Sequence, residues 1–402
     1  MSLTDAIQQF DVILLTDLPL GPNGGGAERV AETLLIGLRG RTGIGHLSSV
    51  ELLSGADPSA TTVNPNRPVP DETSIERLYT AVPPAGTPAL SLASDLLRTV
   101  RAQTILNFHA VWLWGLPDKA LPLDKTIYSI HDYWPFCVRR NRTDFFKGQC
   151  QKGDFVRCFM DQNVRPLLPT SLNPFLPGQW YRLVRVTLNN SGCVITPSDF
   201  MRDYLAENGI EESNITVIRN GVDESFFKPP LEVDSDRNII LFVGRPERVK
   251  GLHVLLKAYR QAGLPYRLVI VGPRGESNGT ENYLGKVSDS QLASLYASAR
   301  AVVVPSLWPE NCSMVILEAM SSGAPVIASR LGGNSELVQD GVNGVLTEPG
   351  DVVALRDALR SLRDSTLVRD MGGNGRRLVE SRFTLGEFLN AHEKVYERVR
   401  NQ

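Results

Sequence analysis

VVVPSLWPENCSMVILEAMSSGAPVIAS, residues 302–329, places two short apolar runs on either side of a helical segment. The runs VVVP and APVIAS are bounded by Gly or Pro, which is typical of strands, whereas CSMVILEAMSSG has the length of a helix. A strand, a helix and a second strand in this order predict a βαβ unit of a parallel sheet. The loop SLWPEN is therefore expected at the carboxyl edge of that sheet, where such sheets bind ligands.

The same alternation extends over the rest of the chain. After residue 226 it includes NIILFVGR, YRLVIVGPRG and RAVVVPS, and before that residue it includes DVILLTDLP, TILNFHAVW, KTIYSIHDYW and GCVITPS. We therefore predict an α/β fold with two Rossmann-like domains, each built on a parallel sheet that is covered by helices.

The joint between the predicted domains lies in NGVDESFFKPPLEVDSDR, which is rich in turn formers and carries Pro229 and Pro230. We place the first domain at residues 1–225 and the second at residues 226–384. The segment EFLNAHEKVYERVR indicates a closing helix, and we expect residues 385–402 to pack back on the first domain.

Composition and charge limit the classes of partner. Apolar residues make up 42% and charged residues 21% of the 402 residues, as in globular proteins with more than one core. A net charge of -2 gives no basic excess for nucleic-acid binding. The chain has five cysteines, no basic and apolar leader, and no apolar run near the ~20 residues that span a bilayer. We therefore expect a cytoplasmic protein, whose only membrane contact would be peripheral, at the inner face.

Two carboxylates in the opening stretch, Glu310 and Glu318, are candidates for a binding site. If a helix begins near Ser313, its first free N–H groups face the ligand region and Glu310 stands just ahead of them. Glu318 then lies about a turn and a half inside the helix, where it can reach the same ligand. The alternative is that Glu310 only complements the helix dipole and that Glu318 faces solvent.

A pair of cations follows another strand. Arg245 and Lys250 in GRPERVKG come directly after IILFVG and next to a helix start. Fixed cations beside free helix N–H groups are typical of a diphosphate site. A solvated basic loop is the alternative.

Three glycines lie between the first strand and the first helix. In NGGGAERV, Gly24, Gly25 and Gly26 allow the backbone to approach a ligand without Cβ atoms in the way, although a plain turn has the same composition. The dinucleotide fingerprint G-x-G-x-x-G is excluded, because Arg29 stands at its last glycine.

These motifs together resemble those of the retaining GT-B glycosyltransferases of family 4. The matching pieces, in order, are G-G-A-E-R-V, G-R-x4-K-G, P-E-x7-E-A-M, S-G-A-P-V-I-A-S and G-G-x-x-E-L-V, and the match is strongest from residue 240 to 350. The resemblance implies two Rossmann-like domains that face one another across a cleft. Residues before 225 would hold an acceptor, residues after it a nucleotide sugar, and domain closure would complete the site.

For the donor, the resemblance implies that Glu318 receives the ribose hydroxyls and Glu310 the sugar hydroxyls, since a carboxylate accepts hydrogen bonds from two adjacent hydroxyls. Arg245 and Lys250 would contact the diphosphate and stabilise its developing charge. The residues that would meet the donor mainly through their backbones are Gly25, Gly26, Val287, Asn311, Cys312, Ser313 and Met314. Backbone contacts to the base near Lys286 leave uridine, guanosine and adenosine donors open.

His131 in YSIHDYWP stands where the family has a histidine beside the donor sugar, so the resemblance implies that it acts in catalysis with Glu310, Arg245 and Lys250. A satisfied histidine at a strand end is the alternative. His109 in NFHAVW is similarly placed after a strand.

Two positions depart from the family pattern. Ser313 stands where a glycine is frequent, and Cys312 stands where an aromatic residue is frequent. Neither change removes a backbone N–H, but both alter the space around the sugar hydroxyls.

The implied reaction is transfer of a hexosyl group to a hydroxyl of a glycan, a lipid-linked saccharide or a small molecule, with retention at the anomeric carbon. The leaving phosphate, and not Glu310, would take the acceptor's proton. No cofactor or metal is expected besides the donor, because the only D-x-D, Asp234 to Asp236, falls in the interdomain stretch and indicates a solvated turn.

The segment between Trp134 and Asn190 is basic and rich in aromatic residues. It is compatible with a lipid diphosphate acceptor or an anionic membrane surface, and equally with a solvated loop that packs its aromatic side chains inward. Cys137, Cys150 and Cys158 within it could hold zinc with one histidine, but their spacing C-x12-C-x7-C favours free buried thiols.

Two other functions fit the same motifs. One is another GT-B enzyme, such as a nucleotide-sugar epimerase or a sugar-phosphate synthase. The other is a catalytically silent sugar-nucleotide-binding subunit, against which the joint presence of Glu310, Glu318, Arg245, Lys250 and His131 argues.

Overall fold

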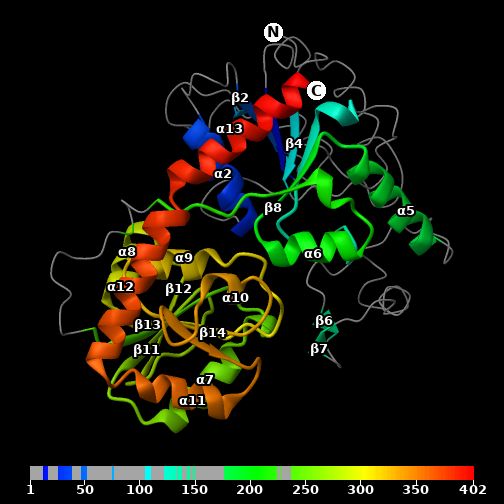
Figure 1. Ribbon diagram of the computed structural model, residues 1–402. Helices are drawn as coiled ribbons and strands as arrows, with labels where there is room; N and C mark the ends of the chain where they lie inside the picture. Colours follow the sequence, from blue (N-terminus) through cyan, green and yellow to red (C-terminus); the bar gives the residue numbers. More distant parts are fainter. Residues whose placement is uncertain are drawn as a thin grey trace, which may run out of the picture.

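The computed structural model describes residues 12–16, 26–38, 47–51, 75–76, 105–109, 122–133, 135–137, 143–144, 148–149, 176–223, 227 and 237–402. These residues form two parallel sheets that carry helices (Figure 1). The predicted α/β class with two Rossmann-like sheets is confirmed. We call the described residues 12–223 together with the last helix the first lobe, and residues 237–382 the second lobe.

The sheet of the first lobe has seven strands in the order β3-β2-β1-β4-β5-β8-β9. Their bounds are β1 Val12–Thr16, β2 Leu47–Glu51, β3 Ile75–Glu76, β4 Ile105–His109, β5 Thr126–Ser129, β8 Cys193–Thr196 and β9 Ile215–Val217. All residues of β4 and β5 are buried, as expected for central strands that are covered on both faces. The strand order reverses between β1 and β4, which is the switch point where such sheets bind ligands.

The described helical elements between these strands are α2 Gly26–Leu38, η1 Leu123–Lys125, α5 Leu176–Asn189, α6 Asp199–Glu207 and η3 Glu212–Asn214. A small antiparallel pair, β6 Thr143–Asp144 and β7 Gly148–Gln149, lies outside the sheet. Helix α6 begins directly after the loop that follows β8, so its N-terminus lies at the carboxyl edge of the sheet.

The sheet of the second lobe has six strands in the order β12-β11-β10-β13-β14-β15. Their bounds are β10 Ile239–Val243, β11 Arg267–Val271, β12 Glu281–Gly285, β13 Ala299–Val304, β14 Val326–Ser329 and β15 Gly344–Thr347. The helical elements are η4 Arg248–Lys250, α7 Leu252–Ala262, α8 Asp289–Ser298, α9 Met314–Ser321, α10 Asn334–Leu337, α11 Val352–Ser361 and α12 Ser365–Arg382. This lobe repeats the doubly wound pattern of the first.

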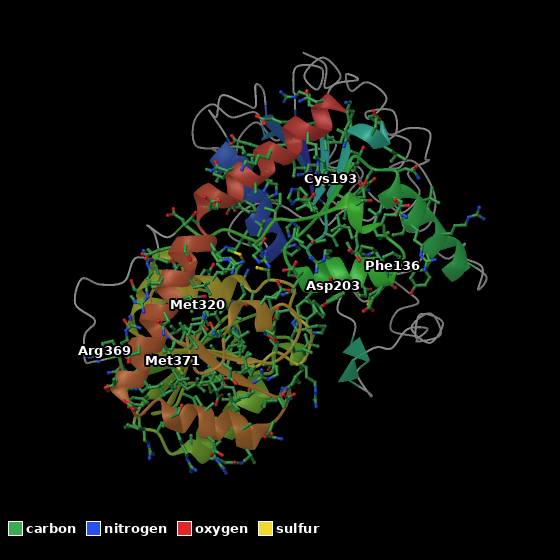
Figure 2. All side chains as sticks on the ribbon, viewed as in Figure 1. Phe136, Cys193, Asp203, Met320, Arg369 and Met371 are labelled. Carbon is green, nitrogen blue, oxygen red and sulfur yellow. The ribbon has the colours of Figure 1, made fainter. Side chains whose placement is uncertain are left out.

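Helices cover both faces of the second sheet. On one face, Leu255 of α7 and Leu359 of α11 are fully buried against the strands. On the other face, Ile316 and Met320 of α9 are fully buried. Figure 2 shows Met320 and Met371 among the side chains of the second lobe and Cys193 among those of the first. Each sheet therefore has a core of its own.

The chain passes between the lobes twice, and the two passages are bonded to each other. Val222 N donates to Phe383 O at 3.0 Å, and Leu385 N donates to Val222 O at 3.1 Å. Helix α13 Leu385–Asn401 then returns to the first lobe, where its buried Phe388 and Tyr396 share a core with α2 (Figure 1). We call residues 219–223 and 383–385 the double crossing.

Candidate functional site

The carboxyl edges of the two sheets meet at the junction of the lobes. Tyr133 Oη, just after β5, donates to Pro309 O at 2.8 Å, and Asn311 Nδ2, just after β13, donates to His131 O at 2.7 Å. Loops that follow strands in both lobes therefore build one site together, as expected for open parallel sheets.

Inside the second lobe, the loops after β10 and β13 lie backbone to backbone. Gly251 has φ +73°, and a Cβ atom there would lie 1.8 Å from Pro305 O, so no other residue fits. Leu307 N donates to Val249 O at 2.7 Å. This close approach is what the K-G pair permits, and it brings Lys250 to the loop that carries Glu310.

Lys250 and Glu310 form an ion pair that is held in place. Lys250 Nζ lies 2.7 Å from Glu310 Oε1, and the two side chains are 19% and 10% exposed. Ser306 Oγ and Trp308 Nε1 donate to the same oxygen at 2.6 and 3.0 Å. Glu310 therefore does more than complement the dipole of a helix, because its position is fixed by three donors.

Helix α9 begins at Met314, with Ser313 at its N-cap, as predicted. The Ser313 side chain makes no capping hydrogen bond. The N–H groups of the first turn therefore lack the usual side-chain cap, beside the Lys250–Glu310 pair. This is a place where an anion can bind.

Glu318 is buried, so the alternative that it faces solvent is wrong. Its side chain is 3% exposed and burial raises its pKa. Tyr296 Oη of α8 donates to Oε2 at 2.7 Å, and Arg29 Nη1 of α2 lies 3.6 Å from Oε1. The buried carboxylate thus takes its counter-charge from the other lobe.

Arg245 does not join the ion pair of Lys250 and Glu310. Its side chain is 62% exposed, and its Nε lies 3.2 Å from Glu247 Oε1. Val287 lies after β12 and packs, partly buried, against the core of the second lobe. The structure thus brings Lys250 and Glu310 together but leaves Arg245 at the surface.

Glycines end three neighbouring strands of the second sheet. Gly272, after β11, has φ +106°, and a Cβ atom there would lie 1.9 Å from Gly244 O after β10. Gly272 N donates to Gly285 O, at the end of β12, at 2.7 Å. The carboxyl edge next to Lys250 is therefore free of Cβ atoms at these positions, which allows a flat ligand to approach the backbone.

Three histidines gather at the carboxyl edge of the first sheet. His109 Nδ1 lies 3.1 Å from His131 Nε2, and their rings are stacked. His392 of α13 is bonded through Nδ1 to Phe388 O at 3.0 Å. Burial lowers the pKa of His131 and of His392 to about 4, and the pKa of His109 falls well below its usual value because of burial and then His131. All three are thus uncharged at neutral pH, so one ring of the His109–His131 pair donates the hydrogen bond and the other accepts it.

Several predicted residues lie outside the described residues: Gly24, Gly25, Cys150, Cys158, Asp234 and Asp236. Gly26 is the first residue of α2. Cys137 is buried, and within the described ranges no group of three His, Cys, Asp or Glu side chains could hold a metal ion. None of the helices that the structure describes has the length and apolar character to cross a bilayer.

Sequence reasoning missed five side chains that fix the candidates: Arg29, Tyr133, Tyr296, Ser306 and Trp308. Four of them stand in motifs that were quoted for other residues. Tyr296 lies in the last turn of α8, and its contact with Glu318 follows only from the packing of α8 against α9.

Known families match both parts of the chain. The model described as Glycosyltransferase Family 4 matches residues 24–226, and the model described as Glycosyl transferases group 1 matches residues 223–378. An uncharacterized glycosyltransferase of Methanocaldococcus jannaschii is 30% identical over 222 residues, which cover 52% of this chain and 60% of that protein. The match therefore spans less than two thirds of that relative.

Solved structures match nearly the whole fold. Sucrose-phosphate synthase from Thermosynechococcus elongatus superimposes with a TM-score of 0.70 at 21% identity, over 96% of this chain and 98% of that chain. The HepE protein of Anabaena, solved in complex with UDP-glucose, superimposes with a TM-score of 0.66 at 20% identity, over 97% of this chain and 100% of that chain. At these identities the likeness establishes the fold, and the predicted GT-B arrangement is confirmed.

Proposed function

Because the chain belongs to glycosyltransferase family 4, we propose that it is a retaining glycosyltransferase that moves a sugar from a nucleotide-sugar donor to a hydroxyl of an acceptor. The observation that carries the proposal is the Lys250–Glu310 pair, held at 2.7 Å beside the uncapped start of α9. A fixed cation, a fixed carboxylate and free N–H groups at one place suit a ligand with both phosphates and hydroxyls.

Lys250 and the first turn of α9 are the proposed diphosphate contacts. A lysine ammonium has three donors, and one of them is used on Glu310, so two remain for phosphate oxygens. Arg245 would swing from the surface toward the phosphates when the donor binds. Arg245 is exposed, and the ion pair that the described residues offer it, with the exposed Glu247, leaves that motion unhindered.

Glu318 is the proposed acceptor for the two ribose hydroxyls. Its contact with Arg29 is an ion pair at 3.6 Å, longer than a hydrogen bond, so Oε1 keeps its capacity to accept. The glycines at the ends of β10, β11 and β12 provide a backbone surface for the base beside Val287. Glu310 would receive the sugar hydroxyls next to the backbone of Asn311 and Cys312.

In the proposed reaction, the bond between the anomeric carbon and the phosphate oxygen breaks and the nucleoside diphosphate leaves with the electron pair. The acceptor oxygen bonds to the same face of the sugar, and its proton passes to the departing phosphate oxygen. Lys250 stabilises the charge on that phosphate, which is the role of a metal ion in other transferases. His131, which is uncharged, would act as a hydrogen-bonding group on the sugar and not as a cation.

UDP-sugars are the first donors to test, because HepE, which shares the fold, was solved with UDP-glucose. The decisive experiment measures the melting temperature with UDP, GDP, ADP and their sugar conjugates for the wild type, Lys250→Ala and Glu318→Ala. A ligand at ~100 times its dissociation constant stabilises by about 2.7 kcal/mol. We expect one nucleotide to raise the melting temperature of the wild type and to leave the melting temperatures of both variants unchanged.

The matched control is Arg330→Ala, which removes a surface cation from an ion pair with Asp340 in the same lobe. It should respond to the nucleotide like the wild type. If no nucleotide stabilises the wild type at millimolar concentration, the donor site is wrong. If a donor binds but no acceptor of any tested class is glycosylated, the result favours a silent subunit. If the sugar of the donor is epimerised with no acceptor present, the result favours an epimerase.

A further inference from the structure

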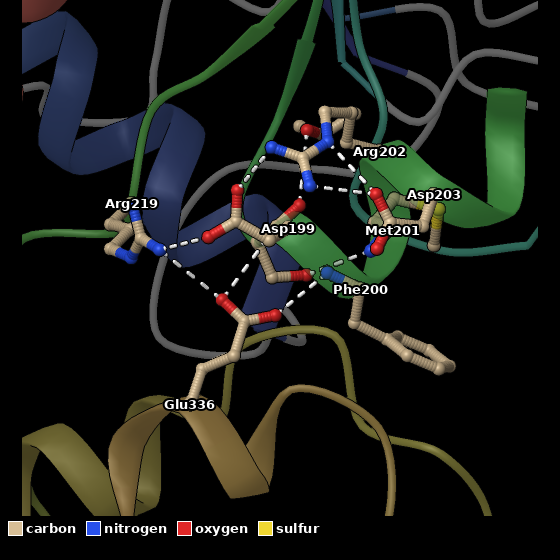
Figure 3. Close-up of polar contacts among 9 residues, drawn as sticks. Asp199, Phe200, Met201, Arg202, Asp203, Arg219 and Glu336 are labelled. Carbon is tan, nitrogen blue, oxygen red and sulfur yellow. Dashed lines mark hydrogen bonds and ion pairs between the residues drawn. The ribbon is translucent and has the colours of Figure 1, made fainter.

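A second junction between the lobes involves Glu336, the glutamate of the G-G-x-x-E-L-V motif, which the proposed function does not use. Glu336 Oε1 accepts from Phe200 N at 2.7 Å and Oε2 accepts from Asp199 N at 3.1 Å (Figure 3). Arg219 Nη2 lies 3.4 Å from Oε2 and also pairs with Asp199. We call Asp199, Phe200, Arg219 and Glu336 the α6–α10 clasp.

The clasp completes a helix of one lobe with a side chain of the other. The side chain of the N-cap Ser198 accepts from Met201 N, the third residue of α6. The first two N–H groups, of Asp199 and Phe200, are both bonded to Glu336. A carboxylate at a helix N-terminus is favoured by the dipole and makes strong charge-assisted bonds. The contact therefore specifies one position of α10 relative to α6.

The two glycines just ahead of α10, Gly332 and Gly333, hold the backbone of the proposed donor-sugar loop, residues 310–312. Gly333 N donates to Glu310 O at 2.6 Å. A Cβ atom on Gly332 would lie 2.4 Å from Glu310 O, and one on Gly333 would lie 1.9 Å from Asn311 O. Only a glycine pair allows this approach. Within one motif, the two glycines therefore contact the donor-sugar loop, and the glutamate contacts the other lobe.

Cys312 connects the donor-sugar loop to the same junction. Burial raises the pKa of its thiol to about 12, and the thiol is hydrogen-bonded to Asn220 in the double crossing. The charges of Glu336 and Arg219 also shift this pKa, in opposite directions. Arg219 itself is the neighbour of Asn220. The donor-sugar loop thus lies between the glycine pair and the place where the chain passes from lobe to lobe.

We propose that Glu336 is a positioning residue, which fixes the second lobe on the start of α6 and, through Gly332 and Gly333, sets the position of the donor-sugar loop. Formation of the clasp then orders Glu310 and Asn311 when the lobes come together. The consequence for donor binding rests on the proposed function, whereas the mechanical coupling does not.

The coupling is tested by hydrogen exchange on the full chain without any substrate. In Glu336→Ala the amides of Asp199 and Phe200 lose their acceptor, and we expect them to exchange at least tenfold faster than in the wild type. The result that tests the coupling concerns the donor-sugar loop, away from the substituted residue. Peptides that cover residues 306–313 should also exchange faster. Glu380→Ala, which breaks the Arg376–Glu380 pair within α12, is the matched control and should change neither.

Two milder variants guard against loss of folding. Glu336→Gln keeps an oxygen for one N–H and should give an intermediate effect on both segments. Arg219→Met leaves both N–H bonds of Glu336 in place and should give a smaller effect in the same direction. If α6 exchanges faster in Glu336→Ala while residues 306–313 keep the wild-type rate, the proposal is wrong and the clasp is only a local cap.

Kinetics then separate positioning from catalysis. For Glu336→Ala we expect kcat/KM for the donor to fall about tenfold, with most of the loss in KM and partial recovery in Glu336→Gln. An unchanged kcat/KM together with faster exchange at 306–313 would overturn the functional half of the inference. If the wild type transfers no sugar and binds no donor, the proposed function falls, and the exchange experiment still decides the coupling.

Discussion

The two groups of functional candidates avoid the cost of buried charge in different ways. In the second lobe, the carboxylates Glu310 and Glu318 are buried with a cation beside each. In the first lobe, three histidines lie close together and none has a carboxylate partner within the described contacts, so burial keeps them neutral. Paired charges are sensitive to loss of the partner, and neutral groups are sensitive to acid. The two lobes should therefore fail under different perturbations.

The largest effect is expected when a charge is left without its partner. Lys250→Met removes the cation from Glu310 and, in the proposed reaction, from the leaving phosphate, so kcat/KM should fall by about a thousandfold. The same change leaves a mostly buried carboxylate with only Ser306 and Trp308, which should cost ~1–3 kcal/mol of folding stability. Turnover and chemical unfolding measure the two losses separately. If Lys250→Met lowers kcat/KM no more than Arg330→Met does, Lys250 does not belong to the site.

Glu318 distinguishes a ligand for a diol from a mere buried carboxylate. Glu318→Ala should raise the KM for the donor by about a hundredfold, and Glu318→Gln by about tenfold, since the amide retains one acceptor oxygen. Because burial raises the pKa of Glu318, its loss should cost little stability. Calorimetric titration with the nucleoside diphosphate gives the affinities. Equal affinity for the diphosphate in all three proteins contradicts the ribose role.

Acid should act mainly on the first lobe. The pKa of His392 is about 4 in the folded protein against an ordinary 6.5, so the unfolded chain binds a proton that the folded one does not. This contribution to stability is complete above about pH 6.5 and declines as the pH falls toward 4. For His392 the loss amounts to ~2 kcal/mol at pH 5. Urea unfolding at pH 7.5 and pH 5 measures it. His392→Asn, which can keep the bond to Phe388 O, should show a smaller difference between the two pH values.

The smallest effect is expected for His109, which acts through His131. His109→Leu removes the bond to His131 Nε2, so kcat/KM should fall about tenfold, whereas His109→Asn places an amide near the position of Nδ1 and should stay within about threefold. Steady-state kinetics of both variants decide between them. If kcat/KM falls equally in His109→Asn and His109→Leu, the imidazole of His109 matters for packing and not for its hydrogen bond.

The sequence predicted best those features that lie within one strand–loop–helix segment. The N-cap of α9 at Ser313 and the strands β10, β11, β13 and β14 follow from local apolar runs that are bounded by Gly and Pro. Strands β12 and β15 were not predicted, because ENYLG and GVLT are short, contain polar residues or glycine and lie at the edges of the sheet.

The partners of the candidate residues were beyond local reasoning. Glu318 was expected to face either a ligand or solvent, but its contacts come from α8 and from Arg29, at the opposite end of the chain. No periodicity in the sequence encodes that pairing, since it arises only when two lobes are in place. The same holds for Glu336, whose motif was recognisable while its contact with α6 was not.

The double crossing has a consequence for synthesis on the ribosome. The core of the first lobe includes Phe388, Val395 and Tyr396 of α13, which are made only after the whole second lobe. The second lobe, residues 237–382, has all its strands and helices available earlier. Although domains generally fold in the order of their translation, the lobe begun first here completes its core last. Nascent chains that end before residue 385 should therefore expose the apolar face of α2 until α13 has been made, and should be substrates for chaperones.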